Sequence, residues 1–174
     1  MLNPEMLDID LAVKLCQDNG LFDILIYIWN EVFGDYTTPL IEAIYKISHQ
    51  NEKCLLFAKM ELSDMNQIYD YLSFILTGRQ FPRNAPIGPY QKQTDAKKSI
   101  YHILFSGTCV ELPSKTSAKP HTKRNLNDEP AFPYFNLLLN YNPKRMLSML
   151  NEAFEDSFLN DVSAHKIELT GIQM

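Results

Sequence analysis

Apolar side chains recur along the chain at spacings of three and four residues, which is the period of an α-helix with one buried face. This pattern predicts eight helices on short connections, and no segment predicts a strand. The predicted helices span residues 11–20, 21–33, 38–50, 52–60, 63–78, 94–107, 132–141 and 142–158. The predicted fold is therefore all-α and built from helical hairpins.

Capping signals place the ends of these helices. A side-chain oxygen before a helix can accept hydrogen bonds from its free amides, a proline fits the first turn, and a glycine suits the end. Thr38 with Pro39, and Asn142 with Pro143, combine the first two signals. The predicted N-caps are Asp8 or Asp10, Thr38, Ser63, Thr94 and Asn142, and the predicted stops are Gly20, Gly34, Gly78 and Gly107.

Two of the predicted helices have apolar patterns that indicate how they pack. The helix at 63–78 gathers its apolar residues on one face. The helix at 21–33 is apolar almost all round and leaves a narrow polar stripe, formed by Asp23, Tyr27, Asn30 and Glu31. Such a helix must be covered on more than one side, as happens when hairpins stack in both directions. We therefore expect one helical domain over 1–174, a segment of a longer α-solenoid, with a closed bundle as the alternative.

Two stretches lack a helical pattern. Residues 79–93 combine three prolines with large apolar side chains, so we expect an ordered proline-rich loop whose rings pack on the helices, or else a partner-binding loop. Residues 113–130 are polar and are expected to be a mobile insertion, with a contact to acidic lipid or an acidic partner as the alternative. Because loops often carry contacts, the candidate partner-binding residues are Arg79, Phe81 and Tyr90.

Composition excludes several classes of protein. The chain has 16 basic and 21 acidic side chains, a formal charge of −5, which is the wrong sign for a domain that binds nucleic acid. No apolar run approaches the length of a membrane span, and the start of the chain lacks the pattern of a signal peptide. Cys16, Cys54 and Cys109 are far apart and are predicted to be reduced thiols of a cytosolic protein.

Residues with catalytic or metal-binding chemistry form no familiar pattern. The cysteines and histidines lack the paired spacing of a zinc site, and no phosphate-binding glycine loop or serine nucleophile motif occurs. His102 is predicted to be a packed or surface imidazole, and Trp29 a core residue rather than a ring that stacks a ligand. Glu152 and Asp156 could share a helix face, although a solvated charged face is the simpler interpretation. We expect no catalytic residues, no metal and no cofactor.

Three segments resemble the central region of the vacuolar protein sorting-associated protein 8 family, the large subunit of the CORVET endosomal tethering complex. They are LCQDNGLFDILIYIWNEVFGDYTTPL at 15–40, YLSFILTGRQFP at 71–82 and FPYFNLLLNYNPKRMLSMLNEAFED at 132–156. The first is the most specific, because its glycine, tryptophan and threonine-proline positions fall together. The third is also similar to helical segments of clathrin-heavy-chain-like repeats. Residues 113–130 carry no match.

The resemblance implies a non-enzymatic piece of the α-solenoid between an amino-terminal β-propeller and a carboxy-terminal RING-type zinc module. By resemblance, the intact protein is cytoplasmic and peripheral on the endosomal membrane, binds other tethering-complex subunits, and supports endosome tethering, fusion and traffic to the vacuole or lysosome. Contacts with the early-endosomal Rab GTPase would lie in parts of the parent protein outside this chain. The RING chemistry cannot be carried over, because its Cys and His ligands are missing.

A hypothesis from a different class is a free-standing helical enzyme or ligand-binding domain of unknown substrate. It requires a polar pocket with converging titratable groups. Helices stacked in one direction would favour the scaffold, whereas a closed bundle around such a pocket would favour the enzyme.

Overall fold

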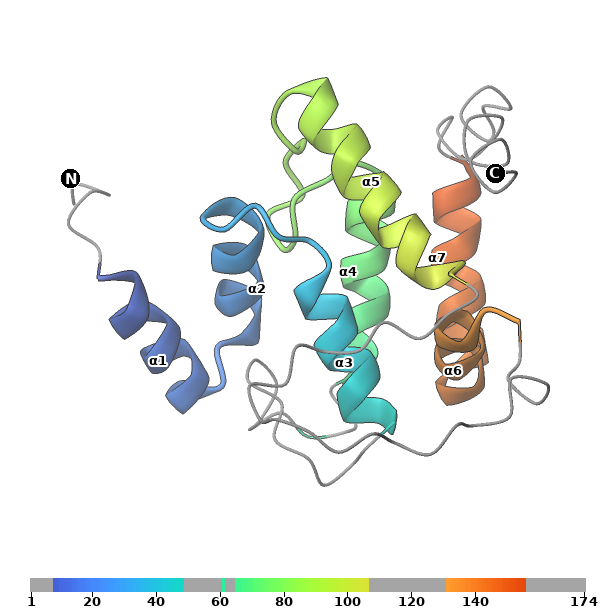
Figure 1. Ribbon diagram of the computed structural model, residues 1–174, viewed down its shortest axis with the longest axis horizontal. Helices are drawn as coiled ribbons and strands as arrows, with labels where there is room; N and C mark the ends of the chain where they lie inside the picture. Colours follow the sequence, from blue (N-terminus) through green and yellow to red (C-terminus); the bar gives the residue numbers. More distant parts are fainter. Residues whose placement is uncertain (1–7, 49–60, 62–64, 107–130, 156–174) are drawn as a thin grey trace, which may run out of the picture.

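A computed structural model describes residues 8–48, 61, 65–106 and 131–155 of the chain (Figure 1). Within these ranges the chain forms seven helices and no strand, with one isolated β-bridge between Arg79 and Pro86. The helices are α1 (Ile9–Asn19), α2 (Phe22–Glu31), α3 (Thr38–Ser48), α4 (Gln67–Leu76), α5 (Tyr90–Leu104), α6 (Pro133–Tyr141) and α7 (Pro143–Glu155). The all-α prediction is confirmed.

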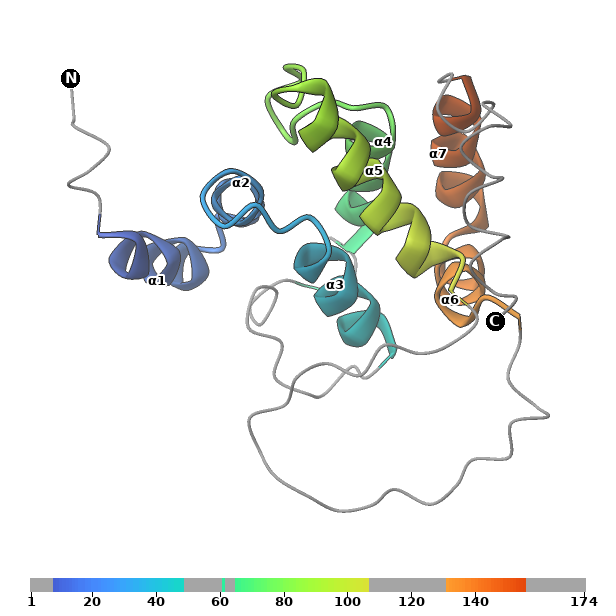
Figure 2. The same cartoon turned by 45° about the horizontal axis from the view of Figure 1, so that its top comes forward.

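The helices succeed one another across the molecule broadly in sequence order, from α1 at one end to α6 and α7 at the other (Figure 1). The main contacts join α1 to α2, α2 to α3, α3 to α4 and α6, α4 to α5 and α7, α5 to α6, and α6 to α7. The first hairpin, α1 and α2, extends away from the remaining helices (Figure 2). This progression is what stacked hairpins produce.

Helix α4 is the central helix of the described structure. Seven of its ten residues are buried, and α3, α5 and α7 all pack against it. The predicted apolar face is confirmed, with Met65 just before the helix and Ile68, Tyr69, Leu72, Ile75 and Leu76 on it all buried. Fully burying a large aliphatic side chain contributes about 1.5–3 kcal/mol. The burial of α4 is therefore a major source of the stability of the fold.

The hydroxyl of Tyr71 lies inside this core and requires a partner. It donates to the carbonyl oxygen of Tyr36 at 2.6 Å and lies 3.2 Å from Asn30 Oδ1. Burial, reinforced by the charge of Asp35, raises the pKa of Tyr71 well above its ordinary value. Asn30 was expected on the polar stripe of its helix but is buried beside Tyr71, and its Nδ2 has no partner within the described ranges. Asn30 belongs to the polar stripe by residue type but lies inside the core, because its Oδ1 accepts a hydrogen bond from the Tyr71 hydroxyl.

Several predicted caps are confirmed. The Asp8 carboxylate accepts from the Leu11 amide at 3.1 Å at the start of α1, and Asn142 Oδ1 accepts from the Arg145 amide at 3.1 Å at the start of α7. Gly20 ends α1 with φ of 66°, a left-handed conformation that glycine adopts without steric cost.

Helix α3 begins at Thr38 as predicted, but the predicted cap is wrong. Asp35 Oδ1 accepts from the amides of Thr37 and Thr38 at 2.8 Å and 3.0 Å, and both threonine hydroxyls also donate to this carboxylate. Burial alone would raise the pKa of Asp35, but the hydrogen bonds from Thr38 and Thr37 outweigh it and lower the pKa. A carboxylate is a stronger acceptor than a hydroxyl, so the charged group takes this position.

Helix α5 begins earlier than predicted. Its first residue is Tyr90, so Thr94 lies inside the helix and does not cap it. The amide of Gln93 already donates to the carbonyl of Pro89 at 3.1 Å. The irregular stretch therefore ends at Pro89, four residues before the predicted boundary. The apolar face predicted for α5 is confirmed, with Ala96, Ile100, Ile103 and Leu104 all buried.

The terminal helices bury less than their patterns predict. Met146, Met149 and Ala153 of α7 are buried, but Leu147 and Phe154 are largely exposed. On α1, Cys16 is buried and burial raises the pKa of its thiol, whereas Leu15 faces outward. Some predictions fall outside the described residues. They are the helix at 52–60, the insertion at 113–130, and the predictions for Cys54, Ser63, Gly107, Cys109 and Asp156.

Replacing Asp35 with alanine should lower the free energy of unfolding by about 1–2 kcal/mol at pH 7, because the start of α3 loses its cap. The pKa of Asp35 is lower in the folded chain than in the unfolded chain. The linked stability is therefore complete above about pH 4 and is lost as the pH falls through the lowered pKa. Urea unfolding of both proteins across this range should show their difference shrinking in acid. A difference that stays constant would contradict the capping role.

Replacing Gly78 with alanine should destabilise the chain more than replacing Gly34 with alanine. Both glycines have a left-handed backbone, with φ of 77° and 66°. An added Cβ at Gly78 would also lie 2.3 Å from Gln93 Nε2, whereas at Gly34 it would meet nothing within 4 Å. We expect a loss of about 1–2 kcal/mol at Gly34 and a greater loss at Gly78 in urea unfolding. Equal losses would show that Gln93 moves aside without cost.

Candidate interaction site

The loop between α4 and α5 is anchored by two apolar side chains. Phe81 is only 6% exposed, and its ring meets Tyr71 and Phe74 edge to face at 5.8 Å and 5.6 Å between centroids. Ile87 is completely buried. Edge-to-face aromatic pairs add about 0.5–1.5 kcal/mol beyond the area they bury. The two anchors hold the residues between them in a defined position.

Polar contacts also join this region to α2. Arg83 Nη1 donates to the Tyr27 hydroxyl at 2.9 Å, and its guanidinium lies 5.4 Å from the centre of the Tyr27 ring. Lys92 Nζ lies 3.1 Å from Glu31 Oε2. Partial burial would lower the pKa of Lys92, but the hydrogen bond and charge of Glu31 outweigh it and raise the pKa. The loop and the first turn of α5 thus tie the first hairpin to the central helix.

The three candidate contact residues occupy different environments. Tyr90 is 78% exposed at the start of α5, beside the exposed Pro89. Phe81 is inside the core, so its side chain positions the loop instead of presenting a surface. Arg79 is half-buried and belongs to a groove described below. Whether Arg79 and Tyr90 bind a partner stays a prediction.

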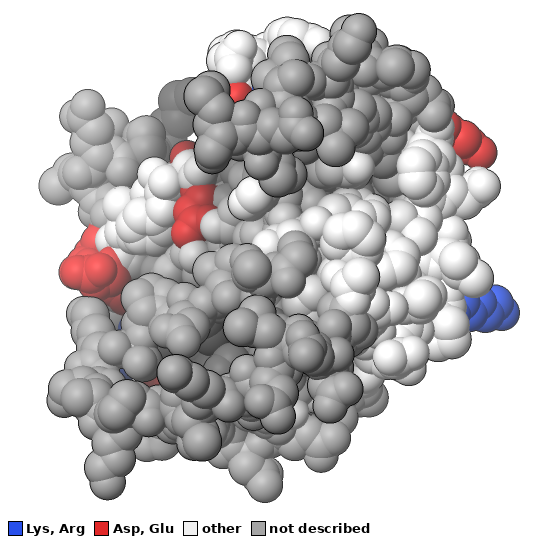
Figure 3. Space-filling model, turned by 45° about the vertical axis from the view of Figure 1, so that its right-hand side comes forward, with Lys and Arg blue, Asp and Glu red and all other residues white. Residues whose placement is uncertain are grey.

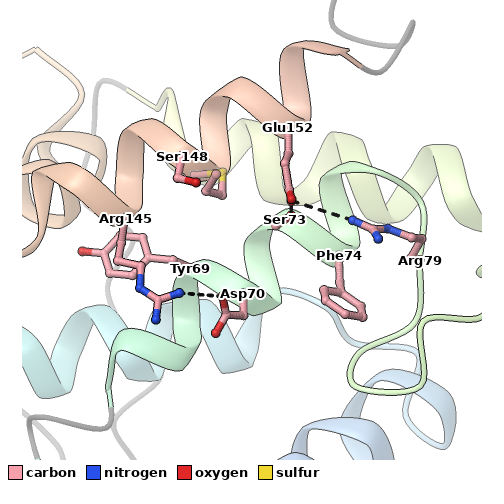
Figure 4. Close-up of a pocket in the computed structure, with 9 residues that line it drawn as sticks. Tyr69, Asp70, Ser73, Phe74, Arg79, Arg145, Ser148 and Glu152 are labelled. Atoms are coloured by element: carbon pink, nitrogen blue, oxygen red, sulfur yellow. Dashed lines mark hydrogen bonds and ion pairs between the residues drawn. The ribbon is translucent and has the colours of Figure 1, made fainter.

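A polar groove of about 250 Å³ lies between α4 and α7 (Figure 4). Helix α7 runs alongside α4, and the loop after α4 brings Arg79 to one end (Figure 4). The lining residues are Tyr69, Asp70, Ser73, Phe74, Arg79, Arg145, Ser148, Met149 and Glu152. Ser148 and Ser73 are the hydroxyls near its middle (Figure 4). The groove therefore presents charges, hydroxyls and two aromatic rings, those of Tyr69 and Phe74.

The charges in the groove are paired across the two helices. Arg145 Nη1 lies 3.2 Å from Asp70 Oδ1, and Arg79 Nη2 lies 3.8 Å from Glu152 Oε2. The buried hydroxyl of Ser73 donates to the same Glu152 oxygen. The Arg79 guanidinium also lies 4.8 Å from the centre of the Phe74 ring. Each carboxylate has an arginine beside it, so the groove carries paired opposite charges, which suit a binding surface.

The residues considered above for catalysis or ligand binding, Glu152, His102 and Trp29, do not form a common site. Glu152 contacts Ser73 and Arg79. Asp156, which could have shared its helix face, lies outside the described residues. His102 is exposed on α5, and Trp29 packs on Phe33 with centroids 5.0 Å apart. Within the described ranges, no three potential ligands gather into a metal site. None of the helices described there is long and apolar enough to cross a membrane.

Figure 3 shows the charged side chains on one face of the molecule. Uncharged side chains cover most of the described surface on this face, and hardly any basic side chains are visible there (Figure 3). A nucleic-acid site would require clustered basic side chains.

Sequence reasoning missed both interhelical contacts of the groove. Asp70 and Arg145 are 75 residues apart, and Ser73 and Glu152 are 79 residues apart, so neither pair leaves a local signal. Ser73 carried the clearest indication, because it is a polar residue within the buried helix α4 and therefore needs a partner.

Double-mutant cycles should separate these two contacts. We expect a coupling free energy of about 1 kcal/mol between Ser73 and Glu152, measured with Ser73→Ala and Glu152→Gln, because one partner is buried and the other is charged. The exposed Arg145–Asp70 pair should couple by less than about 0.5 kcal/mol. Urea unfolding of each set supplies the values. Equal coupling in the two cycles would contradict the importance of Ser73 burial.

Comparison with known proteins identifies relatives of this chain. A family model described as Vps8 central TPR matches residues 1–154. Vacuolar protein sorting-associated protein 8 of Saccharomyces cerevisiae is 50% identical over 161 residues, which cover 92% of this chain and 13% of that protein. The homologue of Mus musculus is 27% identical over 163 residues, and that of Homo sapiens is 24% identical over 158 residues. Each match covers 91% of this chain and 10% of the homologue.

The chain therefore spans roughly a tenth of the length of these relatives. The matched region includes every helix described here except the last residue of α7. Together with the all-α structure, the match establishes the predicted helical-repeat solenoid. The chain belongs to the Vps8 family, within the central TPR region of that family.

Proposed function

We propose that this chain is a non-enzymatic scaffold segment of an endosomal tethering subunit like that of CORVET, which supports endosome tethering and fusion and protein traffic to the vacuole or lysosome. The observation that carries the proposal is the 50% identity to a yeast vacuolar protein sorting protein over almost the whole chain. Identity at half of the aligned positions favours a shared role over a shared fold alone.

The arrangement of the helices supports a scaffold. Stacked hairpins hold their two ends apart and present extended surfaces, which suits a subunit that gathers other subunits between membranes. The groove between α4 and α7 supports the non-enzymatic part of the proposal, because its carboxylates are engaged by arginines and by Ser73. No described feature favours the alternative of a free-standing helical enzyme or ligand-binding domain.

The partners proposed for this segment are other subunits of the tethering complex. Tyr90 and Arg79 are the proposed contacts of the loop face, since Phe81 and Ile87 hold that face rigid from below. Binding of the early-endosomal Rab GTPase is proposed for parts of the longer protein outside this chain. The segment would then be peripheral on the endosomal membrane through the assembled complex.

A segment exchange in yeast tests the proposal. Replacing the matching 161 residues of the yeast relative with this chain should preserve complex assembly and delivery of a vacuolar hydrolase. Deleting the same segment should abolish both. Normal delivery after the deletion would contradict a scaffold role for this region.

Point variants of the exchanged chain should locate the contact face. Tyr90→Ala should reduce co-purification of the other subunits several-fold without lowering the amount of protein. His102→Ala, at another exposed position of α5, is the matched control and should have no effect. Equal co-purification by both variants would remove Tyr90 from the interface.

A further inference from the structure

Large apolar side chains are exposed mainly on the first hairpin. Six of the ten such side chains in the described structure lie between residues 11 and 33, namely Leu11, Leu15, Leu21, Ile24, Val32 and Phe33. Helix α1 packs chiefly on α2 and lies at one end of the described helices (Figure 2). Exposed apolar groups gathered on a projecting element indicate an interaction surface.

The exposed side of α1 is a narrow seam. Asp8, Leu11, Leu15 and Asp18 follow at spacings of three, four and three residues, so they lie along one stripe of the helix, and all four are exposed. Leu11 and Leu15 are 52% and 51% exposed. The opposite side is occupied, since Cys16 is buried and Ile9, Ala12 and Val13 pack on the core. A seam with this spacing is the width that pairs with one helix, as in a coiled coil.

The charge on this helix is mainly negative. Helix α1 and its cap carry three acidic side chains, Asp8, Asp10 and Asp18, and one basic side chain, Lys14, all of them exposed. Asp8 and Asp18 extend the leucine pair in both directions, and Asp10 adds to the acidic surroundings. The cap bond of Asp8 uses one carboxylate oxygen and leaves its charge in place. A partner must therefore offer positive charge on both sides of a short apolar contact.

We propose that the α1 seam docks a basic amphipathic helix of another protein, with two apolar residues four apart and a Lys or Arg three residues beyond each. The apolar pair packs on Leu11 and Leu15, and the flanking cations meet Asp8 and Asp18. The contact covers only two turns of helix, so it is short-lived on its own and gains strength when other contacts of an assembly act with it. The negative charges of Asp8 and Asp18 disfavour binding of an acidic helix or of an anionic lipid surface.

This proposal rests on the proposed scaffold function and adds to it the chemistry of one partner. It can be tested without the tethering complex. The probe is a helical peptide of alanine and glutamine that carries Lys-x-x-Leu-x-x-x-Leu-x-x-Lys. The isotope-labelled chain is titrated with the peptide to millimolar concentration, and amide signals are followed by NMR. We expect shifts concentrated in α1 and a dissociation constant that rises with added salt.

Matched controls isolate each element of the seam. The double substitution Leu11→Ser and Leu15→Ser should weaken binding at least tenfold, whereas Leu147→Ser, at an apolar position of α7 that is 60% exposed, should leave it unchanged. A peptide with Glu in place of both Lys residues should bind at least fivefold more weakly. Circular dichroism of each variant shows whether the fold is kept.

Three results would overturn the proposal. The first is no shift in α1 at millimolar peptide, and the second is equal binding of the Lys and Glu peptides, which would indicate a general apolar surface. The third is a concentration-dependent shift of α1 signals without peptide, which would identify a second copy of the chain as the occupant. Failure of the yeast exchange would leave the peptide result standing, so the two proposals fail separately.

Discussion

A helix with seven of its ten residues buried must be surrounded by other helices, and α4 imposes this constraint on the fold. Helices α3, α5 and α7 pack around it, and the loop that follows it returns Phe81 onto Tyr71 and Phe74. The buried Tyr71 hydroxyl then selects one arrangement, because it must reach the Tyr36 carbonyl beyond α2. The same central helix supplies Asp70 and Ser73 to the groove beneath α7.

Apolar side chains are less fully buried at the two ends of the described structure than around α4. Helix α1 leaves Leu11 and Leu15 in solvent, and α7 leaves Leu147 and Phe154 largely exposed. In a helical-repeat protein the ends and edges of the stack are where other chains can add, because each unit buries only the faces that its neighbours meet. A stable centre with apolar edges is the physical basis of the scaffold role that we propose.

Local signals predicted the helices well and the tertiary contacts poorly. Periodicity and caps at Asp8, Gly20 and Asn142 located α1 and α7, since these signals depend on residues within one or two turns. The competition between Asp35 and Thr38 was missed because both are good caps and only the folded turn decides between them. The burial of Asn30 was not predicted, because its partner Tyr71 lies 41 residues later in the chain and leaves no local signal. The groove pairs were missed for the same reason.

Native-state hydrogen exchange tests most directly whether α4 is the centre on which the other helices depend. Amides of α4 should exchange only through global unfolding, with the highest protection in the described structure, and Tyr71→Phe should lower that protection together with the protection of α3 and α5. Amides of α1 should exchange faster, through local opening at the end of the stack. Protection of α4 no greater than that of α1 would contradict the account.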